Sequence, residues 1–166
     1  MQKDIALRGL YVLLVILVVV IAIVGYNIFF TTNEVELYFS DSQGQYLIPE
    51  TRDIDSDNLY EDTINELIKG PKDDELAATI PEEAELIEVK LENKLLTVNF
   101  TEDLIEFHPG GSTGERMTVY SIVNTLTNFT EVEQVQILVA DEKRPTLSGH
   151  LMIEEPIEFN YDIVKE

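Results

Sequence analysis

The stretch GSTGERMTVYSIVNTLTNFTEVEQVQIL, residues 111–138, contains the two periodicities that decide the fold. Its first part carries apolar residues at helical spacing, which predicts an amphipathic helix from about Thr113 to Phe129 with one face in the core. Its second part begins an alternation of apolar and polar residues through Val135, Ile137 and Val139, which predicts a half-buried strand. A helix followed closely by such a strand indicates a domain that combines helices with a sheet.

The same two patterns recur on both sides of this stretch. They predict strands at 35–39, 45–52, 87–91, 96–100 and 151–153 and a helix at 58–68. Asn58 with Glu61, and Ser112 with Glu115, have the spacing of capping boxes at the starts of the two helices. The element order β-β-α-β-β-α-β-β predicts an α/β (α+β) fold. We expect a two-layer sandwich of one mixed sheet with both helices on one face.

An uncharged apolar run precedes these elements. LYVLLVILVVVIAIVGYNIFF, residues 10–30, is long enough as a helix to cross the hydrocarbon core of a bilayer. Lys3 and Arg8 precede it, so the positive-inside rule places the N-terminus in the cytoplasm. A cleavable signal peptide, the alternative, has a shorter apolar region and small residues at its cleavage site. The expected organisation is a cytoplasmic N-terminus at 1–9, a single-pass transmembrane helix at 10–30, a linker at 31–34 and an extracytoplasmic domain at 35–166.

The composition excludes several classes of partner and site. The chain has 32 acidic residues against 11 Lys and Arg, a formal net charge of −21, and such a surface repels nucleic acid. It has no cysteine, which excludes disulfides, thiolate nucleophiles and a lipid-modified cysteine. A solvated acidic surface is the simplest interpretation. A basic partner, or life at high salt or high pH, is the alternative.

A nucleophile-elbow pattern, G-x-S-x-G, occurs at residues 110–114. Asp141 and His150 follow it in the order of a hydrolase triad. However, an elbow needs a sharp turn directly from strand to helix, whereas a long loop separates Ser112 from the strand at 96–100. A cap at the start of the helix explains Ser112 better, and we expect no catalytic residues and no enzyme activity.

The two histidines, His108 and His150, are candidate metal ligands together with carboxylates such as Glu106. Nothing spaces them as ligands on one helix or strand. The acidic runs at 53–57 and 73–75 lack the ligand order of an EF-hand loop, and the glycine-rich loop lacks the Lys-Ser/Thr ending of a phosphate-binding loop. The sequence therefore predicts no metal, no cofactor and no small-molecule substrate.

Several segments together resemble the GerMN domain of spore germination and sporulation proteins of the GerM type. These segments are VELYF at 35–39, YLIPETR at 46–52, ELIKGP at 66–71, GSTGERMTVYSIVNTLTNF at 111–129 and VEQVQIL at 132–138. The resemblance implies a compact module similar to ring-building motifs, without known catalysis, in a bacterial cell envelope. It also implies contact with other envelope proteins or self-assembly, in sporulation or germination. Proteins of the GerM type carry two such domains, whereas this chain has one.

One surface is the candidate for such contacts. It combines the turn at the start of the second long helix with the loop around His150, and its residues are Ser112, Thr113, Glu115, Arg116, Ser148 and His150. An extracytoplasmic ligand-binding domain for cell-wall glycan or a cation is the alternative function.

Overall fold

The structure is a computed structural model that describes residues 8, 11–22 and 33–165. The chain divides into two units, Met1–Thr32 and Asn33–Glu166. In the first unit, residues 11–22 are helical. Among the described residues, no helix is both long enough and apolar enough to span a bilayer. Residues 10 and 23–30 of the predicted transmembrane segment lie outside the described residues, as do residues 31–32 of the predicted linker.

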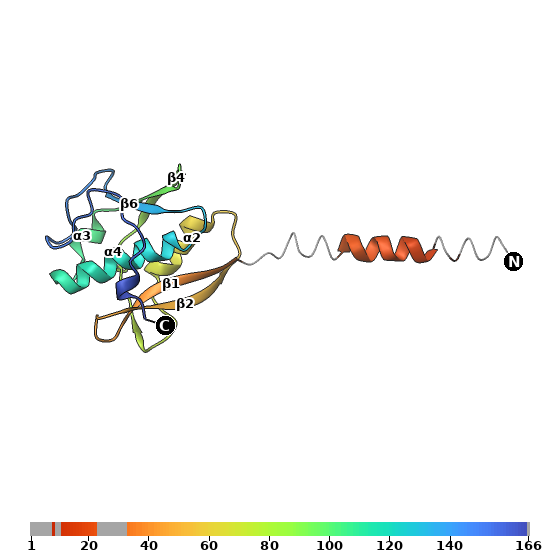
Figure 1. Cartoon of the computed structure of the whole chain (residues 1–166), viewed down its shortest axis with the longest axis horizontal. Helices are drawn as coiled ribbons and strands as arrows, with labels where there is room; N and C mark the ends of the chain where they lie inside the picture. The colour runs from red at the N-terminus through yellow and green to blue at the C-terminus, as the bar shows by residue number, and fades with distance from the viewer. Residues whose placement is uncertain (1–7, 9–10, 23–32, 166) are drawn as a thin grey trace. The chain divides into compact units, whose positions relative to one another are not determined.

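The second unit contains two three-stranded sheets, not the single mixed sheet that the sequence predicted (Figure 1). The first sheet has the order β2-β1-β3 and is antiparallel, while the second has the order β4-β5-β6 with β5 and β6 parallel. The strands are β1 (Asn33–Asp41), β2 (Leu47–Ile54), β3 (Leu76–Ala77), β4 (Leu86–Glu92), β5 (Leu95–Phe100) and β6 (Gln134–Val139). The helices are α2 (Leu59–Ile68), α3 (Asp103–Glu106), α4 (Gly111–Thr127) and the 3₁₀ helix η1 (Tyr161–Ile163).

The edge of β1 away from β2 pairs with β3 at Ser40 and Asp41 and contacts α4 at Tyr38. Tyr38 lies opposite Pro49 of β2, which has no N–H to donate, so the N–H and C=O of Tyr38 face away from β2. There the Tyr38 N–H donates to Oγ1 of Thr125 at 3.0 Å, and Oγ of Ser121 donates to the Tyr38 carbonyl at 2.6 Å. Hydroxyl groups of α4 therefore satisfy this edge at Tyr38, where the pairing with β3 does not reach.

Both sheets and both long helices contribute to one hydrophobic core. Leu37 and Phe39 of β1 and Leu96 of β5 are fully buried in it, as are Leu67 of α2 and Ile122 of α4. Burying a side chain of this size stabilises the fold by about 1.5–3 kcal/mol. The periodicity of the sequence therefore identified these core faces correctly. It was wrong for β4, where a register shift lies between Leu86 and Glu88 and Ile87 is 49 % exposed.

The C-terminal residues follow irregular paths against this core. The predicted strand at 151–153 is wrong, although Ile153 is fully buried and its N–H donates to the Pro145 carbonyl at 2.9 Å. Further on, Val164 forms a parallel bridge with Leu47, and the N–H of Lys165 donates to the Leu47 carbonyl at 2.9 Å. The chain end therefore lies along the free edge of β2 (Figure 1).

Both predicted capping boxes are wrong in their side-chain bonds. α2 has Asn58 at its N-cap as predicted, but the Asn58 side chain makes no cap hydrogen bond. α4 begins at Gly111 after Gly110 as N-cap, earlier than a box led by Ser112 requires. The two glycines have φ angles of 75° and 80°, which glycine adopts at little cost, so the backbone itself starts the helix.

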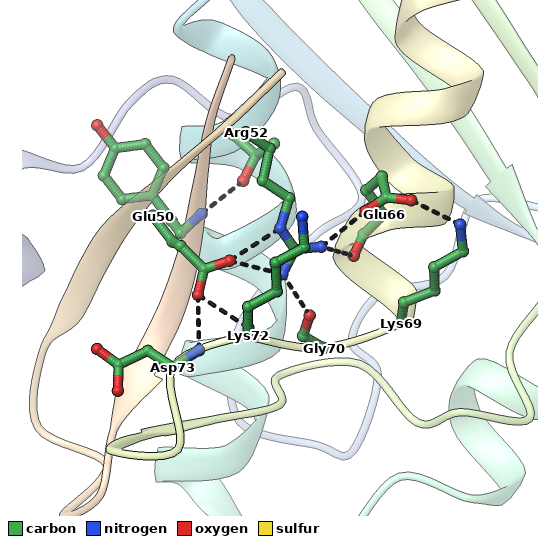
Figure 2. Close-up of polar contacts among 9 residues, drawn as sticks. Glu50, Arg52, Glu66, Lys69, Gly70, Lys72 and Asp73 are labelled. Atoms are coloured by element: carbon green, nitrogen blue, oxygen red, sulfur yellow. Dashed lines mark hydrogen bonds and ion pairs between the residues drawn. The ribbon is translucent and has the colours of Figure 1, made fainter. Parts of the chain in front are cut away.

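A buried guanidinium group ties β2 to the end of α2 (Figure 2). The Arg52 side chain is 3 % exposed, and its Nε and Nη2 donate to Glu50 at 2.8 and 2.6 Å. Its Nη1 donates to the carboxylate and the carbonyl of Glu66 at 2.9 and 3.0 Å, and Nη2 also donates to the Gly70 carbonyl at 2.7 Å. The C-terminal end of a helix carries partial negative charge, so this position suits a cation.

The carboxylate of Glu50, which accepts from Arg52, also binds the loop that follows α2. The second oxygen of Glu50 accepts the N–H groups of Lys72 and Asp73 at 2.9 and 3.1 Å. Partial burial alone would raise the pKa of Glu50, but the Arg52 guanidinium and these two N–H groups hold that pKa below its usual value. Both partners of this ion pair are therefore charged, and the loop has a fixed path.

Candidate interaction surface

A buried carboxylate connects the two segments of the predicted surface. Glu115 lies in the second turn of α4 and is 0 % exposed. One of its oxygens accepts the N–H groups of Leu147 and Ser148 at 2.8 and 2.9 Å. The other accepts the His150 N–H at 2.8 Å and the Ser148 hydroxyl at 3.2 Å. The two segments therefore lie side by side in the structure, with Glu115 buried between them.

These hydrogen bonds keep the Glu115 side chain ionised. Burial by itself raises the pKa of a carboxyl group, because it penalises the charged form. Here the backbone N–H groups of Ser148, His150, Leu151 and Leu147 outweigh that effect, and the pKa of Glu115 lies below its usual value. Glu115 therefore acts as an anionic clamp on the loop at residues 147–150.

The other predicted surface residues differ in their exposure to solvent. Ser112, Thr113, Arg116 and His150 are exposed, and Ser148 is half-buried. Glu115 itself cannot contact a partner, because its carboxylate is fully enclosed. We call the four exposed residues, Ser112, Thr113, Arg116 and His150, the clamp surface; that it binds a partner stays a prediction.

The turn between β1 and β2 lies next to the clamp surface. The sequence did not predict this contact. A Cβ atom on Gly44 would lie 3.0 Å from Cγ2 of Thr113, so the turn touches the start of α4. The turn is held by Asp41, whose carboxylate accepts the Gln45 N–H at 2.7 Å. The sequence of residues 41–44 marks a turn, but no local pattern gives its distance from Thr113.

His108 links the N-cap of α4 to a residue within the helix. Its Nδ1 accepts the Gly110 N–H at 2.9 Å, so Nε2 carries the proton and donates to Oγ1 of Thr118 at 3.0 Å. Thr118 in turn donates to the Thr79 carbonyl at 2.5 Å. Burial lowers the pKa of His108, so the ring is neutral and serves as a structural link.

The family described as "Germane: Sporulation and spore germination" matches residues 36–144. This chain belongs to the Germane family. The resemblance to GerMN domains that the sequence indicated is thereby confirmed.

Solved structures share the fold of this Germane domain. The first GerMN domain of the sporulation protein GerM from Bacillus subtilis is similar with a TM-score of 0.64 and 18 % identity, over 79 % of this chain and 99 % of that chain. The tandem GerMN domains of the same protein give 0.65 and 23 %, over 81 % of this chain and 48 % of that one. A candidate lipoprotein from Clostridium perfringens gives 0.57 and 24 %, over 76 % and 87 %. No curated protein matches the chain.

The Germane domain does not assemble the hydrolase triad considered above. Oδ1 of Asp141 accepts from the Asn99 side chain at 2.7 Å, and the Asp141 N–H donates back to it at 3.1 Å. No hydrogen bond joins Ser112, Asp141 and His150 within residues 33–165. In the described part of the chain, no three His, Asp or Glu side chains are grouped as metal ligands.

Proposed function

We propose that this Germane domain is a non-catalytic protein-interaction or assembly module of the cell envelope, acting in sporulation, spore germination or a related process. The observation that carries this proposal is the clamp surface, where a fully buried carboxylate orders an exposed loop. The family description supports the process.

The energetics of Glu115 support a binding role for the loop. A buried carboxylate is costly unless hydrogen bonds satisfy it, and this one accepts four from the loop at residues 147–150. The loop therefore loses little conformational freedom when a partner binds to it, which lowers the entropic cost of association. A catalytic loop would in addition join a nucleophile to its base, and within residues 33–165 no hydrogen bond joins Ser112 and His150 of this surface.

We further propose that the apolar run at residues 10–30 tethers the domain to the outer face of the cell membrane. The run has no charged residue, and one of the structures with a similar fold is described as a candidate lipoprotein. Because only residues 31–34 separate this run from the domain, its partners would be other membrane-bound proteins or further copies of this chain.

Photo-crosslinking in the full-length chain tests the interaction role. A photoreactive amino acid is placed at Thr113 or Arg116 on the clamp surface, with Lys90 on β4 as an exposed control position. We expect discrete crosslinks to one or a few proteins from positions 113 and 116 and none from position 90. Crosslinks to cell-wall glycan, or the same pattern from all three positions, would contradict the proposal.

The absence of cysteine gives a direct test of the topology. Single cysteines at Lys3 and Lys143 are treated with a membrane-impermeant maleimide in cells without a wall. We expect labelling at position 143 in intact cells and at position 3 only after permeabilisation. Labelling of both positions in intact cells, or release of the chain from membranes at alkaline pH, would show that the tether is wrong.

A further inference from the structure

A groove of about 570 Å³ runs along the C-terminal part of the domain. Four carboxylate side chains line it, namely Glu154, Glu155, Glu158 and Asp162, and no Lys, Arg or His does. All four residues are exposed, and in the described part of the chain none of them makes an ion pair. The groove is therefore strongly negative and has no cation of its own.

Aromatic and apolar side chains form the rest of the groove. Phe159 packs edge-on against Tyr38, with ring centroids 5.7 Å apart, and its ring is tilted against that of Tyr161, with centroids 4.4 Å apart. Tyr161 is 79 % exposed and Met152 is 64 % exposed, so both present apolar surface to solvent within the groove. The side chains of Lys and Arg combine an apolar stem with a cationic head, and they bind well to an aromatic face beside a carboxylate.

Hydrogen bonds to the backbone, from one buried side chain and from a neighbouring strand, hold the walls of the groove. Asn124 of α4 is 0 % exposed; its Oδ1 accepts the Asn160 N–H at 2.9 Å and its Nδ2 donates to the Asn160 carbonyl at 3.0 Å. Val135 and Ile157 exchange two backbone hydrogen bonds at 2.9 and 2.8 Å. A preformed groove binds with a smaller ordering cost than a flexible segment does.

We propose that this C-terminal groove binds an extended segment rich in Lys and Arg from a partner protein. Charge complementarity decides between occupants: a second copy of this chain brings a formal charge of −21, whereas a basic segment neutralises the four carboxylates. The inference goes beyond the proposed function, because the groove consists of other residues than the clamp surface. It can hold even if the clamp surface has no partner.

The test measures binding of a fluorescent peptide of alternating Arg and Ala to the full-length chain in uncharged nanodiscs at physiological salt. The double variant Glu154→Gln/Glu155→Gln removes two charges from the groove. Its control, Glu82→Gln/Glu83→Gln, removes two adjacent exposed charges outside it. We expect Kd to rise about tenfold in the groove variant and less than about twofold in the control, since specific pairs contribute more than diffuse charge.

The aromatic part of the groove is tested with Tyr161→Ala, for which we expect Kd to rise about threefold. Four results would overturn the proposal: no binding, equal weakening in both double variants, equally tight binding of spermine or Ca²⁺, and self-association of the chain that the groove variant abolishes. Circular dichroism of each variant confirms that it is folded.

Discussion

The N–H of Tyr38 in β1 donates a 3.0 Å hydrogen bond to Oγ1 of Thr125 in α4, across 87 residues of sequence. Together with the bond from Ser121 to the Tyr38 carbonyl, it makes the helix a substitute for a neighbouring strand. A buried N–H without an acceptor is costly, so a helix in this position needs hydroxyl side chains on the face toward β1.

The substitution Thr125→Val should therefore destabilise the domain by about 1–3 kcal/mol, because it keeps the shape of the side chain and leaves the Tyr38 N–H unsatisfied. Thr127→Val is the matched control, since the Thr127 hydroxyl bonds only to the Val123 carbonyl of its own helix. Urea denaturation measures both free energies of unfolding. Equal losses in the two variants would contradict the role assigned to Thr125.

Glu115→Gln should cost about 2–3 kcal/mol at neutral pH, because an amide cannot accept all the bonds that the carboxylate accepts. Since the pKa of folded Glu115 lies below its usual value, its contribution is present above the unfolded pKa of about 4.3 and is lost as the pH falls through the folded pKa. The stability difference between wild type and variant should thus shrink below about pH 4.3.

Urea denaturation at a series of pH values checks this dependence, with the exposed Glu83→Gln as control. The control should differ little from wild type at every pH. A stability difference for Glu115→Gln that stays constant from neutral to acidic pH would show that the clamp does not depend on the carboxylate charge.

Arg52→Met should destabilise the domain by about 3–5 kcal/mol, because it leaves buried acceptors of the Arg52 guanidinium without a donor. Arg144→Met is the control: the Arg144 side chain is 31 % exposed and pairs with the exposed Glu102, so its loss should cost less than about 1 kcal/mol. Thermal unfolding followed by circular dichroism separates the two. Losses of similar size would place Arg52 among ordinary surface ion pairs.

Lys94→Gly should stabilise the domain by about 0.5–1 kcal/mol, since the hairpin turn places a side chain in a left-handed conformation that glycine adopts freely. Asn93 and Lys94 have φ angles of 50° and 68°, which identify a type I′ turn between β4 and β5. Lys90→Gly is the control. Lys94 and Lys90 each make one exposed ion pair, with Glu133 and Glu92, but Lys90 lies within β4. We expect Lys90→Gly to lower the urea midpoint and Lys94→Gly to raise it.

Local periodicity predicted the long elements because one face of each is apolar. The helical spacing assigned five residues to the core. Four are fully buried, namely Val119, Ile122, Val123 and Leu126, whereas Phe129 lies beyond the end of α4 and is half-buried. The same spacing gave no role to the hydroxyl residues of this helix. Thr118, Ser121 and Thr125 are nevertheless buried, because the backbone groups that they bond to lie far away in the sequence.

The candidate site shows the same limit. The spacing of Ser112 and Glu115 fits a capping box, yet Glu115 bonds to a loop 32 to 35 residues further on. Nothing in the local sequence distinguishes these two uses of a glutamate. The two segments were named together as a candidate surface with no pattern that required their contact, and the burial of Glu115 came only from the structure.

The bonds between the chain end and Leu47 have a consequence for solubility. A free strand edge offers N–H and C=O groups on which other chains can add strands, the first step of many aggregation reactions. Val164 and Lys165 occupy part of this edge on β2, so the last residues of the domain protect the first sheet. Deleting these two residues would remove the Val164 side chain from the border of the core and uncover the edge of β2, so the shortened protein should precipitate more readily.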